Sequence, residues 1–155
     1  MAESGESVSK RVRSPGYPVI DLKTAIDKVN ELYQAEGRNM AAQSVIFKHW
    51  NYSKKSSAGR KAVAALNSFG MLKIQGSGEN RLIGLSDLAL RIILDEREES
   101  VDRSRAIATA AINPHIHKKL WNLWGLSLPS FGNMRHHLIF TEGFNENYVD
   151  DFINQ

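Results

Sequence analysis

The chain has 155 residues, no cysteine and a formal net charge of +3 at pH 7. The lack of cysteine excludes disulfides, thiolate metal sites and cysteine nucleophiles. The N-terminal segment lacks the apolar stretch of a secretory signal, and no apolar run reaches the roughly 20 residues of a membrane-spanning helix. Composition therefore predicts a globular cytoplasmic protein that does not associate with membranes.

The first part of the chain changes from a polar tail to a helical pattern. Residues 1–16 are polar and contain a basic cluster, Lys10 to Arg13, so we expect a disordered basic N-terminal tail. Apolar residues then recur at helical spacing over about 20–36. Asp21 is the expected N-cap of this helix, and Gly37 is expected to end it.

Two further helices are predicted in the next thirty or so residues of the chain. The patterns cover about 40–50 and 57–69, with Asn39 and Ser56 as the expected N-caps. The residues between them, 51–56, are polar and suit a turn.

At residue 71 the hydrophobic period changes from helical to alternating. Residues 71–75 predict a strand, 76–80 a hairpin loop, and 81–85 the returning strand. Ser86 or Asp87 then caps another predicted helix.

The remaining chain predicts helices with interruptions. They cover about 99–112, a segment from Pro114, about 130–141, and a last segment after Asn145. Asn113 and Asn145 are the expected N-caps of the second and last of these helices. Phe144 is placed to pack against Val149 as a hydrophobic staple.

The order helix, helix, turn, helix and hairpin resembles a winged helix-turn-helix domain. Residues 20–93 carry the resemblance, with Ala58 to Phe69 in the place of the recognition helix and Lys73 to Arg81 in the place of the wing. Leu66 to Leu72 is similar to the segment in which such domains leave the recognition helix. Leu85 to Ala89 resembles the strand-to-helix step after the wing.

The later part of the chain, around Gly143 and Phe144, resembles an uncharacterised prokaryotic and phage family that has a winged-helix core and a helical extension. The expected fold is mainly α with a small β-hairpin wing. We expect a winged-helix domain over 17–95 and a helical extension over 96–155. That extension either packs on the domain or mediates a homodimer.

Positive charge is concentrated in the middle of the chain. Residues 38–81 hold eight basic side chains and one acidic side chain, a net charge of +7, whereas residues 82–155 have a net charge of −3. A basic centre beside acidic segments favours a local polyanion-binding surface. The competing interpretation is an ordinary solvated face.

The resemblance implies a role in binding double-stranded DNA, as in transcription regulation in a prokaryote or phage, with RNA as the less favoured partner. Helix 57–69 would enter the major groove, and wing 73–81 would follow the backbone. Arg60 is suited to guanine and Asn67 to adenine. Gly59 is either a point of close approach to phosphate or a tolerated surface glycine. The expected nucleic-acid-binding residues are Lys54, Lys55, Ser56, Ser57, Arg60, Lys61, Asn67, Lys73, Ser77, Asn80 and Arg81.

Two other function classes remain open. A protein-interaction module without DNA binding would use Phe47, Tyr52 or the tryptophan surface. Trp121 and Trp124 suit either the core or a dimer interface. An enzyme would use the histidines of the C-terminal half, but their spacing of one or two residues does not suit a helical metal pair. We expect no enzymatic activity, metal or cofactor, and a nucleoid-associated location in the cytoplasm if the protein binds DNA.

Overall fold

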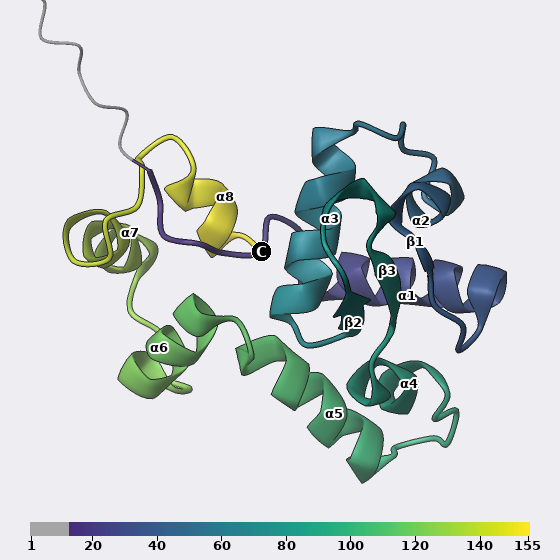
Figure 1. Cartoon of the computed structure of the whole chain (residues 1–155). Coiled ribbons are helices and arrows are strands. Elements are labelled where there is room, and N and C mark those ends of the chain that lie inside the picture. The colour runs from purple at the N-terminus through teal and green to yellow at the C-terminus, as the bar shows by residue number, and fades with distance from the viewer. Residues whose placement is uncertain (1–12) are drawn as a thin grey trace, which may run out of the picture. The chain divides into compact units, whose positions relative to one another are not determined.

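The computed structural model describes residues 13–155 and is mainly α-helical, with one small antiparallel sheet (Figure 1). The helices are α1 (Leu22–Glu36), α2 (Gln43–His49), α3 (Ser57–Ser68), α4 (Asp87–Ile93), α5 (Val101–Ile112), α6 (His115–Trp124), α7 (Phe131–Phe140) and α8 (Val149–Ile153). The strands are β1 (Ala41–Ala42), β2 (Leu72–Gln75) and β3 (Leu82–Leu85), and a short 3-10 helix, η1 (Gly78–Asn80), lies in the β2–β3 turn.

The described residues form two compact units. The larger unit, residues 16–126, contains α1 to α6 and the sheet. The smaller unit consists of residues 127–155 together with the segment that ends at Pro15. The larger unit extends beyond residue 95, where the expected winged-helix domain ends, because α5 packs against α4 and α6 packs against α5.

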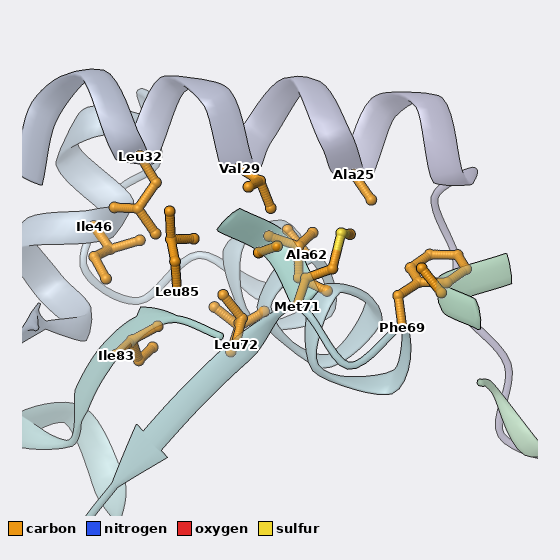
Figure 2. Close-up of a cluster of buried hydrophobic side chains, with 14 of the residues drawn as sticks. Ala25, Val29, Leu32, Ile46, Ala62, Phe69, Met71, Leu72, Ile83 and Leu85 are labelled. Atoms are coloured by element: carbon orange, nitrogen blue, oxygen red, sulfur yellow. The ribbon is translucent and has the colours of Figure 1, made fainter. Parts of the chain in front are cut away.

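The core of the larger unit lies beneath α1. Ala25, Val29 and Leu32 recur every three or four residues on one face of α1 and are at most 1% exposed. Figure 2 shows them pointing towards side chains from α2, α3 and the sheet, among them Ile46 and Leu85. Burial of a large aliphatic side chain stabilises the fold by roughly 1.5–3 kcal/mol. The helical period of the sequence therefore predicts α1 and its buried face correctly.

A structured turn joins α2 to α3. Asn51 adopts φ +60°, a left-handed conformation that asparagine tolerates better than most residues. The Ser56 side chain accepts a hydrogen bond from the Gly59 amide at 3.0 Å, which confirms Ser56 as the N-cap of α3. At the other end of α3, Gly70 has φ +80°, as a helix stop requires.

The sheet has three strands in the order β1-β3-β2, and both pairs are antiparallel. The hairpin of β2 and β3 is confirmed within one residue at each end. Strand β1 is a finding that the sequence did not predict, because residues 41–42 were included in the helix of 40–50. A strand of two residues is too short to show alternating hydrophobicity in the sequence. Residues 41–42 are not helical because they pair with Ile83 and Leu82 of β3.

Three asparagines that were expected to cap helices do not do so. Because residues 41–42 pair with β3, Ala42 and not Asn39 precedes α2, and alanine has no polar side-chain atom that could cap the helix. Asn113 lies at the end of α5, and its side-chain amide donates to the Phe69 carbonyl at 3.1 Å. The Asn145 side chain accepts from the Asn147 amide in a local turn, and Tyr148 precedes α8.

In the smaller unit, α7 packs against α8. The rings of Phe144 and Phe152 have centroids 4.8 Å apart, and Arg135 pairs with Asp150 at 3.0 Å. Ser14 accepts a hydrogen bond from the Asn145 amide at 2.9 Å, so this residue of the expected disordered tail has a defined contact. Residues 1–12 of that tail lie outside the described residues.

Over residues 13–155, the longest helix, α1, has 15 residues, and no helix combines the length and apolarity needed to span a bilayer.

Candidate nucleic-acid interface

Helix α3 has one face in the core and one face in solvent. Ala62, Val63 and Leu66 are at most 1% exposed and face α1 and the sheet. Nine of the eleven predicted site residues lie on the solvent side of this helix, in the turn before it or on the β2–β3 hairpin, and are exposed. They are Lys54, Lys55, Ser57, Arg60, Lys61, Asn67, Lys73, Ser77 and Asn80. Ser56 and Arg81 are half-buried.

The turn and the first part of α3 are joined by two polar contacts. Arg60 donates from Nη1 to the Lys55 carbonyl at 3.1 Å, which holds its guanidinium beside the turn. The Ser56 hydroxyl oxygen is used as the N-cap of α3, so its role is structural in this conformation. Lys54, Lys55 and Arg60 therefore form one basic cluster at the N-terminus of α3, where the helix dipole also favours an anion.

Gly59 is neither a surface glycine nor a point of approach for phosphate. It is buried, and a β-carbon at this position would lie 2.8 Å from Cε2 of Phe47. Both interpretations offered for Gly59 from the sequence are therefore wrong. The residue is small because α3 packs closely against the ring of Phe47 in α2.

The solvent face of α3 has two sides that differ in surroundings. Arg60 and Asn67, seven residues apart, lie on one side. On the other side, Lys61, Ala64 and Ser68 line a groove of about 430 Å³. The opposite walls of this groove come from residues 16–19 and from Pro114 and His115, which precede or begin α6. This groove could not be predicted from the sequence, because its three walls are far apart along the chain.

The β2–β3 hairpin is short and is anchored to α2. Arg81 donates from Nε to the side-chain Oε1 of Gln43 at 2.6 Å, and the backbone N–H of Gln43 donates to the Arg81 backbone carbonyl at 3.0 Å. Gln43 is only 5% exposed, so its side chain depends on this partner. Lys73 and Asn80 are exposed, and in Figure 1 the β2–β3 turn and the start of α3 point towards the upper edge of the view.

Three basic residues lower the pKa of Asp87, the first residue of α4. The hydrogen bond from Arg91, at 2.6 Å, lowers the pKa of the Asp87 carboxyl most, and the charges of Lys73 and Arg38 lower it further. Lys73 of the predicted site is therefore close enough to Asp87 for its charge to act on that carboxyl. Arg38 was counted in the basic segment but not in the predicted site, and its charge acts on Asp87 as that of Lys73 does.

The aromatic surface expected for a protein-interaction module differs from the prediction. Phe47 is fully buried, which corrects the expectation that it is exposed. The ring of Tyr52 packs edge-on against Phe47 with centroids 6.3 Å apart, and the Lys28 ammonium lies 4.8 Å from the Tyr52 centroid. Trp121 is 46% exposed, and Trp124 is half-buried.

The histidines do not form a shared cluster with carboxylates. Within residues 13–155, no three histidine, aspartate or glutamate side chains gather in a way that could hold a metal ion. The His117 ring packs at a tilt against Phe69 with ring centroids 5.9 Å apart, and its Nδ1 lies 3.0 Å from the Ala111 carbonyl oxygen. Burial lowers the pKa of His117, and the contact with Ala111 opposes part of this shift.

The chain was also compared with known proteins. Neither the protein-family comparison nor the searches of curated proteins and solved structures returned a match.

Proposed function

We propose that the larger unit is a winged-helix-like domain that binds double-stranded DNA without catalysing a reaction. The element order supports the fold, since α2, a structured turn, α3 and a β hairpin follow one another and β1 closes the sheet. The function of a transcription regulator in a prokaryote or phage agrees with this fold. Fold alone does not assign function, so the proposal depends on the surface of α3.

One observation carries the proposal. The basic side chains at the start of α3 are exposed, and the segment that contains them, residues 38–81, has a net charge of +7. Lys54 and Lys55 would contact backbone phosphates, whereas Arg60 and Asn67 would reach base edges in the major groove. Lys73, Ser77 and Asn80 would contact the backbone from the hairpin. Arg81 is less available for a DNA contact than these residues, because its guanidinium already binds Gln43.

The test is fluorescence anisotropy with a random-sequence duplex of about 25 base pairs, titrated from low to physiological salt. We expect micromolar binding that weakens steeply with salt. Charge reversal of Lys54, Lys55, Arg60 and Lys61 should abolish it. The matched control is Lys23→Glu, since Lys23 is exposed on α1, which packs on the buried side of α3. Absence of binding at low salt, or equal losses in the control, would contradict the proposal.

A second candidate is a protein-interaction surface on α6 and the loop that follows it. Trp121, Leu123 and Leu126 are 46%, 55% and 92% exposed, which is unusual for large apolar side chains so close together in sequence. A homodimer through the C-terminal helices would use such residues. Sedimentation equilibrium of the wild type and of Trp121→Ser tests this candidate. A wild type that stays monomeric at 100 times the concentration used for DNA binding would reject the homodimer.

A further inference from the structure

We propose that the groove beside α3 is a binding site for a small amphipathic carboxylate, an aromatic or aliphatic body with one anionic group. The groove lies within the larger unit and has a volume of about 430 Å³. This volume is within the range of about 300–1,000 Å³ that is typical of small-molecule sites.

The walls of the groove are mostly apolar. Pro18 is buried and stands opposite the small side chains of Ala64 and Ala65 on α3, while Val19 and Pro114 extend the apolar surface. Because Ala64 and Ala65 have small side chains, this part of the helix surface leaves room for a flat or branched hydrocarbon body. Removal of such a body from water would supply most of the binding free energy.

The polar groups of the groove select the charge of the ligand. Lys61 and His115 line it from α3 and α6, and the described lining contains no aspartate or glutamate. The ammonium of Lys61 carries a full positive charge, and the His115 ring can donate a hydrogen bond. The Ser68 hydroxyl donates to the Ala65 carbonyl at 2.8 Å and so leaves its oxygen as an acceptor. Lys61 and His115 therefore match a carboxylate better than an amine, whereas the Ser68 oxygen does not contribute to anion binding.

The position of the groove connects it to the proposed function. Lys61, Ala64 and Ser68 line the side of α3 next to the side that carries Arg60 and Asn67, the residues proposed to reach base edges. A ligand beside them would occupy space that the DNA needs, so it would compete with the duplex. This coupling depends on the proposed DNA binding, whereas the ligand site itself does not.

The first experiment titrates 1-naphthoate into ¹⁵N-labelled protein without DNA and follows amide shifts by NMR. We expect saturable shifts at Val19, Ala64, Ala65 and Ser68. Ala64→Trp fills the groove from an exposed position and should abolish these shifts. Lys61→Gln should weaken binding about three- to fivefold, as for loss of one exposed ion pair, and Lys48→Gln, on α2, should not.

The second probe is 1-naphthalenemethanol, which has the same rings and no charge. It should bind about three- to fivefold more weakly than 1-naphthoate, with an affinity that Lys61→Gln leaves unchanged. Equal affinities of the two probes, shifts that do not saturate, or binding that survives Ala64→Trp would overturn the inferred site.

The coupling is tested by anisotropy with the duplex. For direct competition, 1-naphthoate at ten times its own Kd should weaken the apparent DNA affinity about elevenfold. Unchanged DNA affinity with the groove filled would overturn the coupling. A protein that binds 1-naphthoate as expected but binds no duplex would uphold the ligand site and contradict the proposed function.

Discussion

The ring of Phe47 packs against Gly59, and its Cε2 atom would be 2.8 Å from a β-carbon at position 59. Phe47 is fully buried in α2, and Gly59 is in the first turn of α3, so this contact sets how closely the two helices approach. The glycine that the sequence associates with DNA is thus a packing residue of the helix pair.

Gly59→Ala should destabilise the protein by about 1–3 kcal/mol, because the buried ring has to move to make room for a methyl group. Replacing glycine by alanine normally stabilises a helix by roughly 1 kcal/mol, so the effect expected here has the opposite sign. Chemical denaturation measures the change. Gly132→Ala in α7 is the matched control, since nothing lies within 4 Å of its added methyl group, and it should be neutral or stabilising. Equal stability of the Gly59→Ala variant and the wild type would contradict the packing role.

Arg81→Ala should lower the free energy of unfolding by about 1–3 kcal/mol, because the nearly buried Gln43 oxygen loses its donor. Lys73→Ala, in the same hairpin but exposed, should change stability by less than about 0.5 kcal/mol. Urea denaturation of both variants gives the comparison. If Arg81→Ala is as stable as Lys73→Ala, the Gln43 bond contributes nothing, and Arg81 returns to the set of available DNA contacts.

Asn113→Ala should destabilise the larger unit by about 1 kcal/mol, since the carbonyl of the buried Phe69 loses the amide that binds it. Asn113→Asp should cost more, because a carboxylate would then face the carbonyl oxygen. Asn122→Ala, on the exposed side of α6, is the control and should have little effect. Thermal unfolding followed by circular dichroism separates the three variants, and equal midpoints for all of them would reject the role of Asn113.

The unfolding free energy should decrease as the pH falls through about 6.5, the ordinary pKa of histidine, because burial lowers the pKa of His117 in the folded protein. The unfolded chain then binds a proton that the folded protein does not bind at this site, and the effect levels off below the folded pKa. His117→Gln should remove this part of the pH dependence. A proton NMR titration of the His117 ring in the wild type should give a midpoint below 6.5, and a midpoint at or above that value would refute the prediction.

If the proposed DNA binding holds, Arg60→Ala should reduce the preference for one DNA sequence over another, by about 1–3 kcal/mol at the base pair that Arg60 would contact. Lys54→Ala should weaken binding to all duplexes alike and lower the slope of log affinity against log salt by about 1. Anisotropy with specific and random duplexes at several salt concentrations measures both effects. Identical effects of the two variants on every duplex would reject a base-reading role for Arg60.

Elements whose signals are local could be predicted from the amino-acid sequence. The spacing of Ala25, Val29 and Leu32 predicts α1, Ser56 and Gly70 delimit α3, and the change of period at residue 71 predicts the hairpin. These signals are readable because helical and strand periodicity, caps and stops depend on residues within a few positions of one another.

Contacts between residues that are far apart along the chain became apparent only from the folded arrangement. β1 forms because Ala41 pairs with Ile83, and residue 59 is a glycine because Phe47 packs against it. Asn113 does not cap α6 but donates a hydrogen bond to the carbonyl of Phe69, 44 residues earlier. The groove on α3 likewise combines three separate segments. Such contacts depend on packing between elements, and that packing has no periodic pattern in the sequence from which it could be predicted.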